Sequence, residues 1–278
     1  MNELDKEVLR AMSHQPKKGE LMSISEMDLK QRSLLFARLA SDAYAAQSVV
    51  REVVVVHGFK EVEFYEKEGA QAYRFENETD VVIACRGTQP TEFNDLKADL
   101  KALPAISETV SRVHRGFKDE VDELWPEVKK DLKTDKKVWF CGHSLGAAMA
   151  TIMAARCTQD SELGTPTQLY TYGSPRVGWP QYVKSLKVDH IRWQNNNDIV
   201  TRVPPRLLHY RHHGKLHYIG STGDINVTGT SNAFKRFLDR LNGMWLGLKK
   251  GQVDNFSDHA MVGYIEHLSR WNGFYKKL

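Results

Sequence analysis

A serine flanked by glycines, placed between a predicted strand and a predicted helix, constrains this chain more than any other feature. Residues 142–146 have the sequence Gly-His-Ser-Leu-Gly and match G-x-S-x-G. The apolar residues 138–141 precede the motif, and the small, apolar residues 145–150 follow it. Such a strand–turn–helix arrangement exposes the serine hydroxyl at the carboxyl edge of a parallel sheet. A side chain at either glycine would collide where helix and strand approach each other, so the motif predicts a tight turn at Ser144.

Ser144 is a candidate nucleophile. A serine hydroxyl attacks poorly at neutral pH unless a base takes its proton and an acid orients that base. The first turn of the helix after Ser144 directs free N–H groups toward the place where an oxyanion would develop. We therefore expect the backbone N–H of Leu145 to be one oxyanion donor. The alternative is a serine in an ordinary turn with no chemical role.

The order of predicted elements favours an α/β fold: a mostly parallel central sheet with helices on both faces. Beyond residue 113 helices and strands alternate, and the four β-type runs before it are separated by short breaks, which indicates an antiparallel edge. We predict a helix over 28–46, strands over 53–56, 62–65, 72–75 and 81–84, a helix over 117–132, a strand over 138–141, a helix over 145–157, a strand over 169–172, a helix near 181–186, a strand over 190–194 and a helix over 261–268.

Length and charge narrow the choice of class. The 278 residues suffice for one large domain, and we expect a polar tail over 1–20 followed by a single α/β-hydrolase domain over 21–278. The net charge of +4 is spread along the chain, so nucleic-acid binding is not implied. Cys85, Cys141 and Cys157 are odd in number and lie in apolar segments, which predicts buried thiols and no disulfide framework.

The sequence predicts no membrane-spanning segment, because no apolar stretch is long enough to cross a bilayer. The first residues carry acids where a secretory signal needs positive charge, and no apolar run follows them. A cytoplasmic location is the expectation, with secretion by another route as the alternative.

An ordered series of motifs resembles the class 3 lipases, the family of the filamentous-fungal lipases, over roughly residues 41–268. The resemblance implies an α/β-hydrolase fold and a carboxylester hydrolase that acts on lipid esters without a metal or cofactor. The motifs are Cys-Arg-Gly-Thr at 85–88, Val-His-Arg-Gly-Phe at 113–117, Gly-His-Ser-Leu-Gly-Ala at 142–147, Tyr-Gly-Ser-Pro-Arg-Val-Gly at 172–178, Asn-Asp-Ile-Val at 197–200 with Pro204 and Pro205, and Asp-His-Ala-Met at 258–261 with Tyr264.

Asp198 and His259 are the candidate acid and base. Asp198 follows the predicted strand 190–194, and the chain order Ser, Asp, His suits this fold. From spacing alone, an aspartate that forms a turn after three asparagines is a real alternative, and the resemblance implies the catalytic role. His259 lies in a polar loop before a predicted helix and matches the family's base. We prefer it to His143, which adjoins the nucleophile and is expected to point away from its proton.

Other histidines have structural explanations. His114 and His267 are predicted to be packing or surface residues. Four more could suggest a metal site, but no cysteine or carboxylate accompanies them at ligand spacing, and the resemblance implies a structural segment. We therefore expect no metal. The four are His209, His212, His213 and His217.

The second oxyanion donor is expected at Thr88, in the loop that follows the predicted strand 81–84. In the resembled family the residue at this position donates its N–H and often its hydroxyl. The alternative is that residues 87–88 only turn the chain.

An amphipathic helix is predicted between Pro90 and Pro104, with Phe93, Leu96 and Leu100 on its apolar face. The resemblance implies a lid that covers the site and turns outward at a lipid surface, which would give transient contact with a lipid interface. This segment is longer and more charged than the fungal pattern. A second amphipathic stretch, 234–248, is expected to pack near the acyl pocket, with contact to an anionic membrane as the alternative.

The sequence thus predicts a triacylglycerol lipase or esterase with a Ser-His-Asp triad and an acyl-enzyme intermediate. The more polar lid segment keeps a feruloyl-type or short-chain esterase open, and a phospholipase A1-like activity is a further alternative. A lipase-like binding module that has lost catalysis is the alternative from another class.

Overall fold

An eight-stranded sheet organises the protein in the computed structural model, which describes residues 23–87, 104–107, 110–227 and 258–274. The expected polar tail, 1–20, lies outside these residues. The strands of the sheet are β1 (Glu61–Lys67), β2 (Ala70–Glu76), β3 (Asp80–Cys85), β6 (Lys137–His143), β7 (Gln168–Tyr172), β8 (His190–Asn195), β9 (Lys215–Ile219) and β10 (Ile225–Asn226), in the order β1-β2-β3-β6-β7-β8-β9-β10. A separate antiparallel hairpin is formed by β4 (Pro104–Ile106) and β5 (Arg112–His114).

The centre of the sheet is parallel and its edges are antiparallel. Parallel ladders join β3, β6, β7, β8 and β9 in turn. At one edge β1, β2 and β3 pair antiparallel, and at the other edge β10 pairs antiparallel with β9. Both the parallel centre and the antiparallel opening strands agree with the prediction from sequence.

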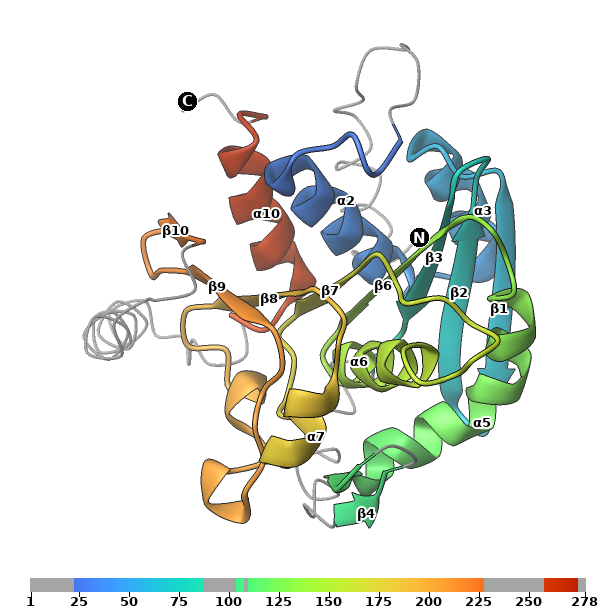
Figure 1. The fold of residues 1–278 in the computed structure, drawn as a ribbon. Coiled ribbons are helices and arrows are strands. Elements are labelled where there is room, and N and C mark those ends of the chain that lie inside the picture. The colour runs from blue at the N-terminus through green and yellow to red at the C-terminus, as the bar shows by residue number, and fades with distance from the viewer. Residues whose placement is uncertain (1–22, 88–103, 108–109, 228–257, 275–278) are drawn as a thin grey trace.

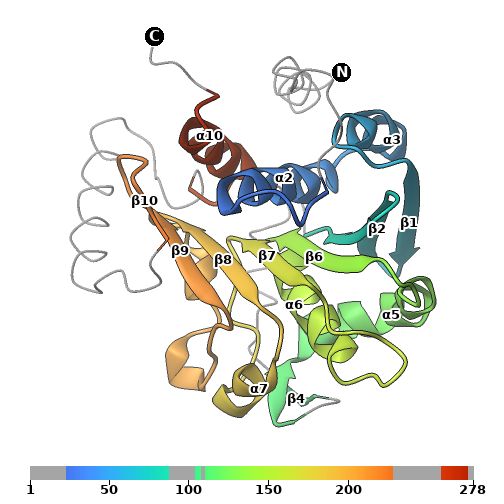
Figure 2. The same cartoon turned by 45° about the horizontal axis from the view of Figure 1, so that its top comes forward.

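Helices cover both faces of the sheet, as predicted (Figures 1 and 2). Each face has its own buried apolar cluster, one packed around the α5 and α6 side and the other around the α2 and α10 side. No helix in the described part of the chain is long and apolar enough to cross a bilayer. One face carries α2 (Leu29–Asp42), α3 (Gln47–Val56) and α10 (Met261–Trp271); the other carries α5 (Arg115–Asp131), α6 (Leu145–Cys157) and α7 (Pro180–Ser185).

The prediction of a strand over residues 53–56 is wrong, because these residues end helix α3. Val50, Val53 and Val54 are buried while Val55 is 60% exposed. This spacing is that of one helical face. A run of β-branched residues favours a strand only weakly, and packing of the apolar face against the core overrides that preference.

The three cysteines are buried and free, as the sequence predicted. Burial raises the pKa of the Cys157 thiol to about 12 and raises that of the other two thiols as well. Reactive thiols have a lowered pKa and partial exposure, so these side chains act as small apolar residues of the core.

The turn at the end of β6 depends on close contact between backbones. A Cβ at Gly146 would lie 2.2 Å from the carbonyl oxygen of Cys85, and one at Gly142 would lie 2.4 Å from the carbonyl oxygen of Gly146. Real Cβ atoms do not approach so closely, so α6 can begin directly against β3 and β6 only with glycine at both positions. The collision expected from the sequence is confirmed.

We expect Gly146→Ala to lower the free energy of unfolding by about 1–3 kcal/mol, because the new methyl group must push α6 away from β3. Gly164→Ala is the matched control, since a Cβ there would meet nothing within 4 Å. The control should stay within about 0.5 kcal/mol of the wild type. Urea denaturation of the two variants measures the difference, and equal stability would contradict the contact argument.

Candidate active site

Ser144 occupies a strained turn between β6 and α6. Its backbone has φ 57° and ψ −128°, which is unusual for a residue with a side chain. The Ser144 N–H donates to the carbonyl of Tyr172 at 3.1 Å, so the neighbouring strand β7 holds the turn in place. Such strain is typical of functional sites and matches the geometry expected of a nucleophile elbow.

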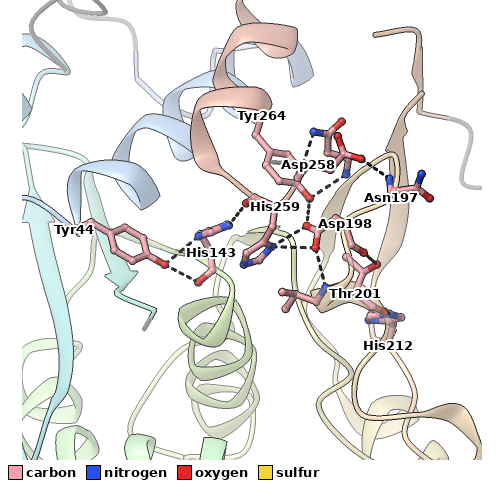
Figure 3. A network of polar contacts seen from close by, with 11 residues as sticks. Tyr44, His143, Asn197, Asp198, Thr201, His212, Asp258, His259 and Tyr264 are labelled. Carbon is pink, nitrogen blue, oxygen red and sulfur yellow. Dashed lines mark hydrogen bonds and ion pairs between the residues drawn. The ribbon is translucent and has the colours of Figure 1, made fainter. Parts of the chain in front are cut away.

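Asp198 and His259 form a buried pair, although 61 residues separate them in the sequence (Figure 3). The imidazole Nδ1 of His259 lies 3.0 Å from each carboxylate oxygen of Asp198. Asp198 follows the end of β8, and His259 lies just before α10. The exposed fraction is 0% for Asp198 and 8% for His259. A carboxylate on Nδ1 fixes the ring so that Nε2 is left to act on a proton.

Two further donors hold the Asp198 carboxylate. The hydroxyl of Tyr264, on the first turns of α10, donates to Oδ2 at 2.7 Å, and the backbone N–H of Val200 donates to Oδ1 at 2.9 Å. Burial raises the pKa of Tyr264 well above its ordinary value, and the charge of Asp198 adds to this effect. Tyr264 therefore stays protonated and keeps donating to the carboxylate.

The loop that carries the base is tied to the loop that carries the acid. Asp258 accepts hydrogen bonds on Oδ2 from the backbone N–H of Asn197 at 3.0 Å and from the side chain of Asn196 at 3.2 Å. Its carbonyl accepts from the amide of Asn195 at 3.1 Å. The asparagines before Asp198 thus join the two loops, in addition to turning the chain.

Gly173 lies against this pair, and it directly follows Tyr172, whose carbonyl accepts from the Ser144 N–H. A Cβ built on Gly173 would be 2.6 Å from Asp198 Oδ2 and 2.8 Å from His259 Nδ1. Gly173 has φ +59°, so both its backbone and its missing side chain make room for the pair. The buried hydroxyl of Ser144 makes no hydrogen bond with the described residues, and such bonds often tighten only when substrate is bound.

His143 contacts the loop of the candidate base and has both of its own ring nitrogens occupied. Its Nε2 lies 2.7 Å from the carbonyl oxygen of His259, and its Nδ1 lies 3.0 Å from the hydroxyl of Tyr44 (Figure 3). A carbonyl only accepts, so Nε2 carries the hydrogen and Nδ1 accepts from Tyr44. Burial, together with the neighbouring His259, holds the pKa of His143 well below its ordinary value. His143 is therefore a neutral ring with both nitrogens engaged elsewhere.

Of the two expected oxyanion donors, the structure describes Leu145. Leu145 is the first residue of α6, so its N–H has no acceptor within the helix. Thr88, the expected second donor, lies outside the described residues, as do Phe93, Leu96 and Leu100 of the expected lid and the stretch 234–248. Gly87, the last described residue before them, faces the turn: its Cβ would lie 2.7 Å from the carbonyl oxygen of His143.

The remaining histidines make local contacts. His190 Nδ1 lies 3.1 Å from His213 Nδ1, His212 Nε2 lies 2.9 Å from the Thr201 carbonyl, and His217 Nδ1 lies 3.2 Å from the Lys215 carbonyl. Within the described ranges no group of three or more histidines, cysteines and carboxylates could hold a metal ion. His209 is exposed, and its ring is tilted against that of Trp179, with ring centroids 5.6 Å apart.

Comparison with known proteins agrees with this geometry. Residues 64–208, from β1 to the 3₁₀ turns after β8, match the family model described as Lipase (class 3). The chain belongs to the class 3 lipase family. The family has the α/β-hydrolase fold, which the sheet described above shares, and the resemblance found in the sequence is confirmed.

Individual relatives are similar in sequence to parts of this chain. The lipase of Rhizomucor miehei is 30% identical over 207 residues, which are 66% of this chain and 56% of that one. The secreted mono- and diacylglycerol lipase 1 of Fusarium solani is 38% identical over 109 residues, 36% of this chain and 32% of that one. The matches thus span about half or less of these relatives. A solved Rhizomucor miehei lipase propeptide complex has a TM-score of 0.63 at 23% identity and covers 85% of this chain and 91% of that one.

Sequence reasoning missed three supporting side chains: Tyr44, Asp258 and Tyr264. In the sequence, Asp258 and Tyr264 stand out only as members of one motif. Their roles depend on contacts between segments that lie 61 to 99 residues apart. The one local signal is the position of Tyr264. It follows His259 by five residues and lies near the start of the helix predicted after that histidine.

We expect Tyr264→Phe to lower kcat by about tenfold or more, because the buried Asp198 loses a hydrogen bond worth about 1.5–3 kcal/mol. KM should change little, since the Tyr264 hydroxyl binds the Asp198 carboxylate and is not expected to contact the substrate. Tyr170→Phe is the matched control: it removes a buried tyrosine hydroxyl whose partner, Gln168, is uncharged. Steady-state kinetics with a soluble ester tests the pair, and an equal loss in both variants would contradict a role for Tyr264 in holding Asp198.

His114 is a buried packing residue, one of the two roles expected for it. It is 3% exposed, its ring stacks on Phe117 with centroids 4.1 Å apart, and neither ring nitrogen has a partner in the described part of the chain. Burial lowers the pKa of His114 from 6.5 to about 4. A proton on this ring would be an unpaired buried charge, which the fold disfavours.

His114 should therefore make the protein sensitive to acid. Its pKa is lower in the folded state, so as pH falls below 6.5 the unfolded chain binds the proton first and stability declines until about pH 4. We expect His114→Phe to remove about 3 kcal/mol of this decline. Urea denaturation near pH 7 and near pH 4 measures this loss of stability. His209→Asn, at an exposed position, is the control. An unchanged decline in His114→Phe would refute the assignment.

Proposed function

We propose that the protein is a serine carboxylester hydrolase that cleaves acylglycerol esters through an acyl-enzyme intermediate. The observation that carries the proposal is the buried Asp198–His259 pair beside the strained turn of Ser144. In this proposal Ser144, His259 and Asp198, from three separate segments, supply the nucleophile, the base and the acid. Their chain order and their positions after β6, after β8 and before α10 suit this chemistry.

In the proposed first step, the Ser144 oxygen attacks the ester carbonyl while His259 takes the hydroxyl proton. Asp198 stabilises the imidazolium that forms. The N–H groups of Leu145 and Thr88 bind the oxyanion of the tetrahedral intermediate. His259 then returns its proton to the leaving alcohol, and the carbon–oxygen bond of the ester breaks to leave an acyl group on Ser144.

In the second step, water replaces the alcohol. His259 takes a proton from the water, which attacks the acyl carbonyl, and returns it to Ser144 as the free acid leaves. The neutral His143 helps by donating Nε2–H to the carbonyl of His259, which keeps the base loop against the nucleophile turn.

The substrate class follows from the family and from the amphipathic segment before β4. Relatives are named as a lipase and as secreted mono- and diacylglycerol lipases. The sequence between Pro90 and Pro104 alternates apolar and charged residues at helical spacing, which suits a cover for an apolar acyl group. Acylglycerols with one, two or three acyl chains are the proposed substrates.

We expect Ser144→Ala to lower kcat by about 10⁴–10⁶, because the acyl-enzyme can no longer form. A fluorophosphonate probe should label the wild type at Ser144 and leave the variant unlabelled. Thr158→Ala is the control, since this hydroxyl caps the far end of α6. Activity within tenfold of the wild type would remove Ser144 from the mechanism, and an unlabelled wild type would favour a binding module without catalysis.

A substrate panel distinguishes the ester classes. Mono-, di- and triacylglycerols, a phosphatidylcholine, a feruloyl ester and short-chain p-nitrophenyl esters should be compared as kcat/KM on the wild type and on Ser144→Ala. We expect the acylglycerols to be cleaved fastest. A preference for the feruloyl or short-chain esters, or for the phospholipid, would replace the acylglycerol proposal while leaving the serine chemistry intact.

A further inference from the structure

Two neighbouring leucines face solvent on a short 3₁₀ turn beyond the active site. Leu207 is 91% exposed and Leu208 is 49% exposed, and no residue of this turn, η3 (Arg206–Leu208), is buried. Single exposed apolar residues are common on protein surfaces. Two adjacent leucines on a turn with no buried residue contribute little to the core and form an exposed apolar patch.

The segment that carries these leucines is strongly basic. No aspartate or glutamate occurs between Asp198 and Asp224. Within the described part of the chain no carboxylate pairs with Arg206 or Arg211; the Arg211 guanidinium donates instead to the carbonyls of Arg206 and Tyr210. The cationic residues of the segment are Arg202, Arg206, Arg211 and Lys215.

The exposed apolar surface continues from η3 to the β4–β5 hairpin. Ile106, 75% exposed, pairs across the hairpin with Arg112. The Arg112 guanidinium lies 5.2 Å above the Trp179 ring, and that ring is 5.6 Å from His209, the residue after η3. We call this the leucine–arginine surface; it consists of Ile106, Arg112, Trp179, Arg206, Leu207 and Leu208.

Both views place these segments at one end of the molecule. The short orange helical turns that precede β9 lie beside α7, at the end where β4 also lies (Figures 1 and 2). Backbone bridges from Val113 to Gly178 and from Gly178 to Arg211 join the hairpin to the basic segment. The surface is therefore one connected region.

The leucine–arginine surface is fixed to the active site. The turn η2 (Val200–Arg202) follows Asp198 directly, and the hydroxyl of Thr201 donates to the Asp198 carbonyl at 2.8 Å. Arg176, from the segment after β7, donates to the carbonyls of Arg202 and Pro204 and so holds the connection between η2 and η3. A partner that binds η3 is therefore held at a fixed position relative to Asp198.

We propose that the leucine–arginine surface docks the protein onto a lipid layer that carries anionic headgroups. Leucine and isoleucine side chains enter the boundary between headgroups and acyl chains, and guanidinium groups bind phosphate oxygens in pairs. Arg206 and Arg211, which pair with no carboxylate among the described residues, match a negative surface and gain nothing from a neutral one. Docking would serve the proposed hydrolysis of lipid esters, and in that sense the inference rests on the proposed function. Binding itself needs no catalysis.

The test is binding of the full chain carrying Ser144→Ala, which separates docking from hydrolysis. Vesicles of phosphatidylcholine alone and of phosphatidylcholine mixed with phosphatidylglycerol are sedimented with the protein. We expect tighter binding to the anionic vesicles, and most of the difference should vanish in concentrated salt, which shortens the Debye length to about 3 Å.

Substitutions on η3 locate the surface. Arg206→Ser should weaken partition onto anionic vesicles about fivefold, as expected for one cation near an anionic surface, and Leu207→Ser about tenfold or more. Arg51→Ser with Val55→Ser is the matched control: it removes one cation and one aliphatic side chain, 60% exposed at Val55, from α3 at a distance from η3. The control should bind like the parent.

The outcomes decide the proposal separately from the hydrolase proposal. With Ser144 restored, Arg206→Ser and Leu207→Ser should hydrolyse a dissolved short-chain ester at the wild-type rate, which shows that both fold. Equal binding to neutral and anionic vesicles, or undiminished binding by the η3 variants, would overturn the docking surface. So would a dimer that dissociates on Leu207→Ser in sedimentation velocity, because the surface would then belong to a contact between two copies.

Discussion

A single buried carboxylate organises the candidate site. Asp198 receives the imidazole of His259, the hydroxyl of Tyr264 and the N–H of Val200, and none of its surface is exposed. A buried charge is tolerated only where it is well paired and hydrogen-bonded. The end of β8, the start of α10 and the turn η2 therefore have to meet at this one group, and the stability of the fold and the alignment of the base are the same requirement.

The nucleophile side of the site depends on short distances between backbones. Glycines at 142, 146 and 173 leave room for a carbonyl, a strand and the acid–base pair, respectively. The turn at Ser144 can be strained because β3, β6 and β7 fix it from several directions. The site thus combines a rigid turn on one side with a network of side-chain hydrogen bonds on the other.

Much of this arrangement could be predicted from the sequence. The elbow at Ser144, the alternation of helices and strands and the choice of Asp198 and His259 follow from local patterns and ordered motifs. Helix α3 was missed because a run of valines favours a strand while its spacing suits a helix. The roles of Tyr44, Asp258 and Tyr264 were missed because a hydrogen bond between distant loops leaves no trace in local spacing. Such partners become visible only in the folded structure.

The contact between His143 and His259 couples the two halves of the site mechanically. His143, the residue before Ser144, donates to the carbonyl of His259, and Tyr44, just after α2, donates to His143 in turn. If the loop that carries His259 swung outward, the buried imidazole of His143 would lose its hydrogen-bond acceptor. The loop is therefore expected to stay bound to the Ser144 turn, so that the candidate triad forms or separates as one unit.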